Sequence, residues 1–153
     1  MRDAYLFALM EKNRNTIISK VEQLPEDKRM LVPQGFNNNI HWQLGHLLTV
    51  TSGILFRFAG KDAVVPENYQ SFFGNGTKPA DWNGEPPAWD TLIQELTAQC
   101  KLVADTFEGK LDEPLAVKEN FAKAETVREA FIVNLGHENY HYGMINAMLR
   151  VLA

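Results

Sequence analysis

The sequence contains very little cysteine and no long run of apolar residues. Cys100 is the only cysteine among 153 residues, so no disulfide can form within the chain, as is typical of proteins in the reducing cytoplasm. No stretch approaches the roughly 18 consecutive apolar residues that a membrane-spanning helix needs. The N-terminal segment also becomes polar too early for a signal peptide. We therefore expect a soluble, cytoplasmic protein with no membrane partner.

Basic residues are neither in excess nor clustered. The chain has 15 Lys and Arg against 19 Asp and Glu, which gives a formal net charge of −4. Nucleic-acid-binding domains usually carry a basic patch, so we expect no nucleic-acid partner. The length predicts a single domain, residues 1–153, and a composition of 45% hydrophobic and 22% charged residues is ordinary for a globular protein.

The sequence also lacks sustained alternation of polar and apolar residues, so it predicts no β-sheet. Apolar residues instead recur with helical spacing in four segments, at about 3–24, 38–60, 88–107 and 126–151. Asn38 or Asn39 is expected to cap the second helix. Thr126 and Glu129 have the spacing of a capping box at the start of the fourth. Four such helices predict an all-α fold, a four-helix bundle, with Cys100 as a small core residue of the third helix.

The fourth helix is apolar nearly all round, which predicts a central position or a subunit interface. The connection between the second and third helices, residues 61–87, is well above the usual limit of ~12–15 residues for a loop without structure. It contains the aromatic residues Tyr69, Phe72, Phe73 and Trp82. We expect this loop to pack along the bundle. The alternative is that it also forms one wall of a pocket. Residues 108–125 are expected to hold a short helical turn.

All four histidines lie in two short stretches, HWQLGH at 41–46 and HENYH at 137–141. Positions four apart on a helix share a face, so His137 and His141 can direct both imidazoles at one metal ion. The alternative is two histidines in a polar turn of the helix. The H-E-x-x-H spacing is also that of zinc metalloproteases, but no His, Asp, Glu or Cys follows His141 to supply their third ligand. The sequence therefore argues against a protease.

A third ligand must come from the second helix. His41 and His46 lie about 140° apart around that helix, so one face cannot present both. His46 is in mid-helix, where a buried imidazole without a partner would be costly, whereas exposure or capping explains His41 in the first turn. We therefore predict a divalent-metal site made of His46, His137 and His141, with open positions for water or substrate.

Further residues within a helical turn of these histidines are candidates for the site. Glu138 is a candidate general base, with a supporting or packing role as the alternative. Trp42, Gln43 and Asn134 are candidates to line a substrate pocket or to orient an imidazole. Imidazole suits zinc, nickel, copper and iron alike, so ligand type leaves the metal open.

These features resemble the DinB-like superfamily of bacterial metal-binding four-helix bundles. The resemblance covers nearly the whole chain: the NNNIHWQLGHLL stretch, the long loop with glycine and tryptophan, and GHENYHYG near the end. In that family a histidine in a GHL-like position and an H-x-x-x-H pair hold the metal, which correspond to His46, His137 and His141. The resemblance implies zinc or nickel as the cofactor, and a homodimer.

The resemblance also implies a class of reaction. Characterised members include transferases that use low-molecular-weight thiols such as bacillithiol or mycothiol, and a maleylpyruvate isomerase. We therefore expect a metal-dependent S-transferase or hydrolase that activates a thiol or water for attack on a small electrophile. One alternative is a non-catalytic metal-binding protein for stress response or sensing. Another is that the histidines hold no metal and the protein acts through the apolar surface of its fourth helix.

One departure from the family limits what the resemblance implies. Many members follow the second histidine of the pair with Arg-Gly-Gln, whereas this chain has Tyr142, Gly143 and Met144. The resemblance therefore extends to the fold and the metal ligands and names no particular substrate.

Overall fold

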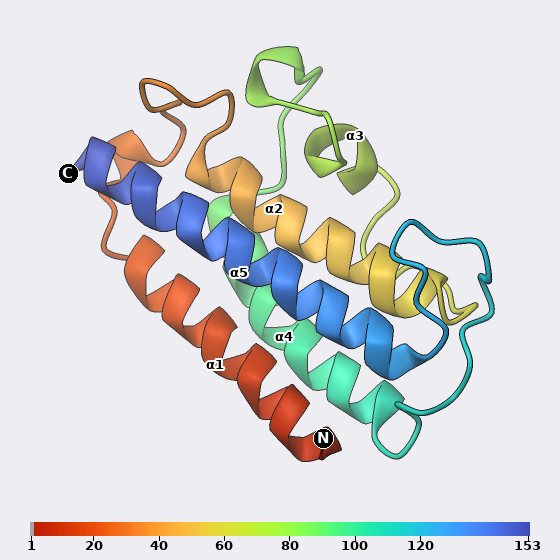
Figure 1. The fold of residues 1–153 in the computed structure, drawn as a ribbon. Helices are drawn as coiled ribbons and strands as arrows, with labels where there is room; N and C mark the ends of the chain where they lie inside the picture. Colours follow the sequence, from red (N-terminus) through yellow and green to blue (C-terminus); the bar gives the residue numbers. More distant parts are fainter. Residues whose placement is uncertain (1) are drawn as a thin grey trace.

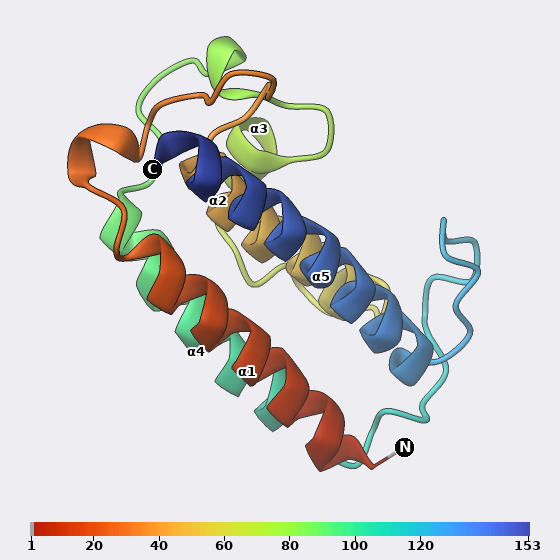
Figure 2. The same cartoon turned by 60° about the vertical axis from the view of Figure 1, so that its left-hand side comes forward.

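The structure is a computed structural model that describes residues 2–153, and over that range it contains helices and loops but no β-strand. Four long helices form a bundle: α1 (Asp3–Val21), α2 (Ile40–Thr51), α4 (Trp89–Phe107) and α5 (Val127–Leu152). Figure 2 shows α1 beside α4, and α2 beside α5. The short α3 (Tyr69–Phe73) lies next to α2 (Figure 1). The predicted all-α bundle is confirmed.

The helix ends follow local signals in the sequence. The Asn39 side chain accepts a hydrogen bond from the backbone N–H of Trp42 at 2.8 Å, so Asn39, one of the two candidates, is the cap of α2. Thr126 and Glu129 form both bonds of the predicted capping box on α5. The first helix ends at Val21, earlier than predicted, because Leu24 turns into the core just before Pro25.

The second predicted helix, residues 38–60, is α-helical only as far as Thr51, which its sequence did not indicate. After α2 the chain forms a π-helical segment, η2 (Ser52–Arg57), in which hydrogen bonds reach one residue further than in an α-helix. In this segment Ile54, Leu55 and Phe56 are buried although they are consecutive. Gly60, with φ of 72°, ends the segment in the left-handed conformation that glycine adopts without strain.

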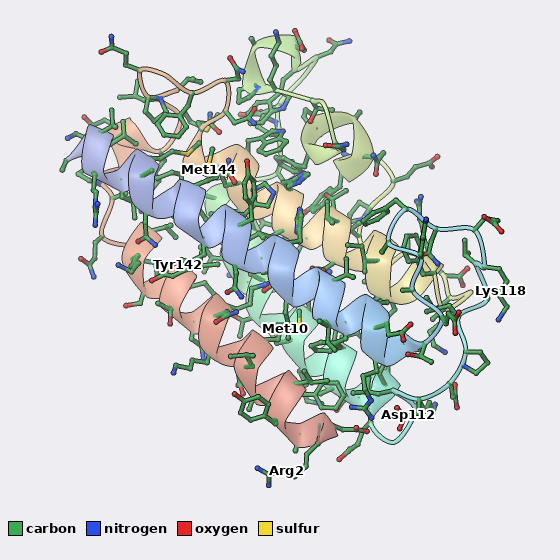
Figure 3. All side chains as sticks on the ribbon, in the orientation of Figure 1. Arg2, Met10, Asp112, Lys118, Tyr142 and Met144 are labelled. Carbon is green, nitrogen blue, oxygen red and sulfur yellow. The ribbon has the colours of Figure 1, made fainter. Side chains whose placement is uncertain are left out.

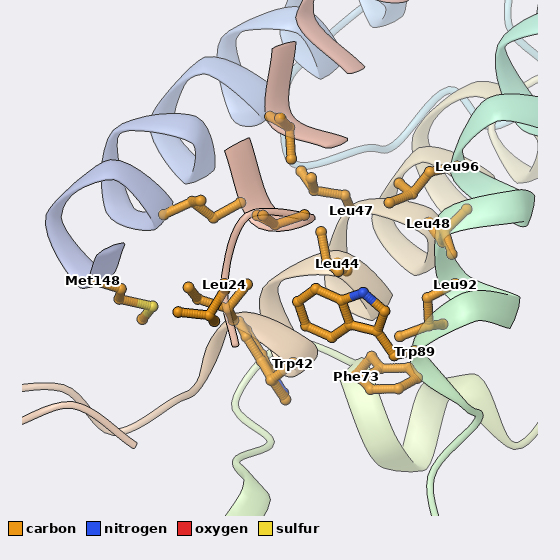
Figure 4. Packing of buried hydrophobic residues seen from close by; sticks show 14 of the residues in the cluster. Leu24, Trp42, Leu44, Leu47, Leu48, Phe73, Trp89, Leu92, Leu96 and Met148 are labelled. Atoms are coloured by element: carbon orange, nitrogen blue, oxygen red, sulfur yellow. The ribbon is translucent and has the colours of Figure 1, made fainter. Parts of the chain in front are cut away.

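The apolar core consists of two clusters. The first joins α2, α3 and the start of α4 with the C-terminal parts of α1 and α5, and Figure 4 shows Leu44, Leu47 and Leu92 gathered between these helices. The second joins the other ends of α1, α4 and α5 with η2 and includes Met10 (Figure 3). Cys100 is partly buried against this second cluster, and burial raises its pKa to about 11.

The loop at 61–87 packs on the bundle, as expected. It contains α3 and the short 3-10 helix η3 (Pro79–Asp81). Phe73 is fully buried against α2, where the absence of a side chain at Gly45 makes room for its ring. The expected helical turn in residues 108–125 was wrong: that segment forms turns and an isolated bridge between Pro114 and Thr126.

Helix α5 packs against both α1 and α2 but leaves one side uncovered. Ile132, Tyr140 and Val151 on that side are about half exposed or more, at 48%, 64% and 51%. Over residues 2–153, none of the helices combines the length and the apolar character that crossing a membrane requires.

Candidate metal centre

The three predicted ligands meet between α2 and α5. The Nε2 atoms of His46 and His137 are 3.2 Å apart. One ring nitrogen from each of His46, His137 and His141 lies within 4.8 Å of the others. His46 and His141 are 4% and 7% exposed, and His137 is partly buried. The structure therefore places three imidazoles where one ion can contact all of them.

Hydrogen bonds on the far side of two rings set their orientation. The Nδ1 atom of His46 lies 2.6 Å from the Phe73 carbonyl oxygen, and Nδ1 of His141 lies 2.6 Å from the Gln43 amide oxygen. Because these oxygens only accept, each Nδ1 carries the proton and each Nε2 presents a lone pair. The Trp42 indole also stacks on the His46 ring, with centroids 4.3 Å apart. Such outer contacts fix the tautomer of metal-binding histidines.

The donor set fits a divalent cation. The His137 Nδ1 atom is buried without a hydrogen-bond partner in the described chain, and its Nε2 faces the lone pair of His46 Nε2. Two lone pairs at 3.2 Å repel each other unless a proton or cation lies between them. A tetrahedral ion with metal–nitrogen distances of about 2.0–2.1 Å separates its nitrogen ligands by roughly 3.3 Å. The His46–His137 distance is close to this value, and the third nitrogen lies within 4.8 Å of both, so the group can hold a divalent ion of that size.

Burial keeps these imidazoles in the neutral form. Desolvation, together with the neighbouring His46 and Arg14, lowers the pKa of His137 to about 4. Desolvation and the other two histidines lower the pKa of His141 to about 3, and desolvation also lowers the pKa of His46. Neutral imidazole is the form that binds metals, so the ligands need not lose protons at neutral pH.

A cavity of about 440 Å³ opens onto the three histidines. Its walls come from α2, from α5, and from the loop residues 37–38 and 75–78. The loop between α2 and α4 therefore does wall a pocket, the second of the two alternatives above. Trp42 and Gln43 line the cavity, as do Tyr140 and Met144 from α5. A larger hollow of about 580 Å³ follows the outer face of α1 and contains no histidine, so size alone does not locate the site.

Two other predicted site residues lie elsewhere. Asn134 and Glu138 are completely buried in the bundle and are not part of the cavity wall. Glu138 Oε1 accepts hydrogen bonds from Arg14 Nε and Nη2 at 3.0 and 2.6 Å, and from Thr51 and Asn134 at 3.2 Å each. Burial alone would lower the pKa of Arg14, but the charge and hydrogen bond of Glu138 outweigh it and raise that pKa. This arrangement favours the supporting role for Glu138 over that of a general base.

His41 is not exposed, so exposure, one of the two explanations given above for this residue, was wrong. Only 4% of the residue is exposed, its Nε2 lies 2.8 Å from the Pro87 carbonyl oxygen, and Phe73, Trp82 and Trp89 surround its ring. The loop at 61–87 folds over the first turn of α2 and covers it. Sequence reasoning also missed that the Phe73 carbonyl orients His46. Two signals were available: the glycine beside His46, and the aromatic residues in the loop.

Comparisons with known proteins gave a family match. No curated protein matches the chain. The model of the DinB superfamily matches residues 9–145, a range that includes all three histidines and most of the bundle. Because the match covers most of the chain and includes the loop and the three histidines, the chain belongs to the DinB superfamily.

Proposed function

We propose that the protein is a metal-dependent enzyme that activates a thiol or water for attack on a small electrophile, as an S-transferase or hydrolase does. The observation that carries this proposal is the meeting of His46, His137 and His141 at the wall of an open cavity. Zinc or nickel is the proposed cofactor. A divalent ion held by three imidazoles lowers the pKa of a thiol or water that it binds, and so supplies a nucleophile near neutral pH.

The chain's own residues would prepare the site and admit the substrate. Phe73 and Gln43 hold two of the imidazoles in the ligating tautomer through their hydrogen bonds. Trp42, Tyr140 and Met144 flank the space in front of the histidines. Glu138 is bonded to Arg14 inside the bundle, so we do not assign it a proton-transfer step.

The proposal is tested by following thiol transfer to a small aryl chloride, and hydrolysis of an activated ester, with zinc- or nickel-loaded protein. The wild type should exceed the uncatalysed rate of at least one reaction. His141→Ala and the metal-free protein should not, because the first lacks one ligand and the second lacks the ion. Wild-type rates equal to those of His141→Ala in both assays would contradict the enzymatic proposal.

The non-catalytic alternative is favoured by one observation. The histidines come from two helices, and His46 is also bonded to the loop carbonyl of Phe73, so a bound ion would tie α2, α5 and the loop together. If the ion serves stability, a chelator should unfold the bundle, since binding free energy then contributes to folding. If the ion instead serves catalysis, the chelator should remove the metal while the protein keeps its helical circular dichroism spectrum.

We also propose a homodimer. The uncovered side of α5, with Ile132, Tyr140 and Val151, is the surface that we expect to pair. Sedimentation equilibrium should give twice the chain mass of 17.4 kDa at micromolar concentration, and a single-chain mass would contradict the dimer.

A further inference from the structure

The cavity in front of the histidines contains no acidic residue. The chain as a whole has more acidic than basic side chains, 19 against 15, yet the cavity wall includes Lys78 and neither Asp nor Glu. The nearest buried carboxylate in sequence, Glu138, is neutralised by Arg14 and does not reach the wall. The wall of the cavity therefore carries no carboxylate, and Asp81, which pairs with Lys78, is not part of that wall.

The ligands do not reduce the charge of a bound ion either. Imidazole binds metals as a neutral molecule, so a divalent ion at His46, His137 and His141 would keep both of its positive charges. Sites with a carboxylate ligand cancel part of that charge. In this cavity, which is partly shielded from water, the uncancelled charge favours an anionic ligand.

Two side chains in the wall have donors to offer such a ligand. The Gln43 amide oxygen accepts from His141 at 2.6 Å, and its NH₂ group makes no hydrogen bond within the described chain. The Lys78 side chain is 49% exposed, and its Nζ forms a long ion pair with Asp81 Oδ2 at 4.0 Å. An exposed pair of this kind is weak, so a ligand carboxylate can compete with Asp81 for the ammonium group at the rim.

The backbone that carries Lys78 is tied to the metal ligands. The hydroxyl of Thr77, the preceding residue, accepts from the Trp42 indole N–H at 2.9 Å and lies 2.8 Å from the Gly74 carbonyl oxygen, to which it donates. Trp42 in turn stacks on His46. The position of the lysine relative to the histidines is thus set by packing, and only its flexible side chain has to move to reach a ligand.

We propose that the cavity selects small carboxylate-bearing thiols, whose sulfur faces the three histidines while the carboxylate meets Lys78 and the Gln43 NH₂ group. This inference rests on the proposed function and makes it more specific, because it names the class of thiol that the site takes. The apolar surfaces of Trp42 and Met144 would contact the carbon chain between sulfur and carboxylate.

The test compares two thiols of equal length on cobalt-substituted protein, 3-mercaptopropionate and its neutral analogue 3-mercaptopropionamide. Binding is read from the visible spectrum of the cobalt ion, and the measured quantity is the ratio of the two affinities. The wild type should prefer the acid, and added salt should reduce that preference, since it screens the charge of Lys78.

Lys78→Gln should lower the affinity for the acid by about threefold to tenfold and leave that for the amide unchanged. Gln43→Glu should lower the ratio further, because it keeps an acceptor for His141 but places a negative charge in the wall. Lys118→Gln is the matched control: it removes the same charge from the exposed connection between α4 and α5 (Figure 3) and should leave the ratio at the wild-type value.

Equal affinities of the wild type for the two thiols, or equal effects of Lys78→Gln and Lys118→Gln, would overturn the inference while leaving a metal site and thiol binding intact. A protein that binds no cobalt at all would overturn both this inference and the proposed function. The two failures are thus distinguished by the cobalt spectrum recorded before any thiol is added.

Discussion

The imidazole of His141 depends on one neighbouring amide for its orientation. Its Nδ1 donates to the Gln43 oxygen at 2.6 Å, and no other hydrogen bond holds the ring within the described chain. Gln43→Leu removes that acceptor and should lower zinc affinity by about 10- to 100-fold, the usual cost of losing such a partner. Competition with a chromophoric chelator measures the affinity.

Gln94→Leu is the control for that substitution. Gln94 is exposed on α4 and does not line the cavity, so its replacement should leave zinc affinity unchanged. Equal affinities in wild type and Gln43→Leu would show that the His141 ring is held by packing alone.

The lowered pKa values of His137 and His141 predict how the stability of the metal-free protein depends on pH. In the unfolded chain both histidines take up protons near pH 6.5, whereas in the folded protein they stay neutral down to about pH 4 and about pH 3. The unfolded state therefore binds more protons below pH 6.5, and stability should fall as pH decreases from about 6.5 toward 4. Urea denaturation at a series of pH values measures this slope.

The double substitution His137→Gln with His141→Gln isolates this contribution from that of the carboxylates. It should flatten the decline between pH 6.5 and 4.5 in the metal-free protein. A slope identical to that of the wild type would contradict the assignment of these two histidines as buried and neutral.

At the scale of elements, the contact between α2 and α3 depends on Gly45. A Cβ atom at this position would lie 2.4 Å from Cγ of Phe73, and the ring is fully buried. Gly45→Ala should therefore displace α3, destabilise the protein by about 1–3 kcal/mol, and weaken zinc binding, because the Phe73 carbonyl would leave His46. Thermal denaturation and zinc affinity measure the two effects.

Gly53→Ala is the matched control for Gly45→Ala. Gly53 is the second residue of the π-helical segment η2, which follows α2. A Cβ there meets no atom within 4 Å, so the substitution should leave both stability and zinc affinity near the wild-type values. If Gly45→Ala behaved in the same way, the approach of α3 to α2 would not be what orients His46.

The four long helices are also joined by one buried polar network. Arg14 of α1 contacts Glu138 of α5, Thr51 of α2 and Gln99 of α4, and both members of the ion pair are completely buried. Glu138→Gln leaves the Arg14 charge without its partner and should cost about 3–5 kcal/mol of stability. Replacing both residues by Met should recover most of that loss, because no buried charge then remains.

Urea denaturation of the metal-free protein measures these changes. The exposed pair Lys101 and Asp105 on α4 serves as the control, and Asp105→Asn should change stability by less than about 1 kcal/mol. A double Met variant as unstable as Glu138→Gln would show that the network contributes more than charge compensation.

At the scale of the whole molecule, the sequence predicted the bundle and the grouping of the three histidines because both rest largely on local spacing. The helical period places His137 above His141, and the mid-helix position of His46 makes it the better partner from α2. The covering of His41, the support of His46 by Phe73 and the pairing of Glu138 with Arg14 depend on how distant segments pack. Spacing within one helix does not contain that information, so these features emerged only from the structure.

The π-helical segment Ser52–Arg57 illustrates the same limit at a helix end. Its residues have ordinary helical periodicity, yet Ile54, Leu55 and Phe56 all enter the second core cluster, which that periodicity does not predict. The capping residues Asn39 and Thr126, in contrast, accept hydrogen bonds from backbone N–H groups only three residues later in the chain. Local sequence therefore contained the signal for both caps.

The most direct measurement of the central claim is metal content by elemental analysis, on protein purified without a histidine tag. The wild type should carry about one equivalent of zinc or nickel per chain, and His46→Ala should carry little, because two imidazoles from one helix leave the site incomplete. A wild type that binds no divalent ion even after titration, or a His46→Ala variant that keeps its full equivalent, would contradict the three-histidine site.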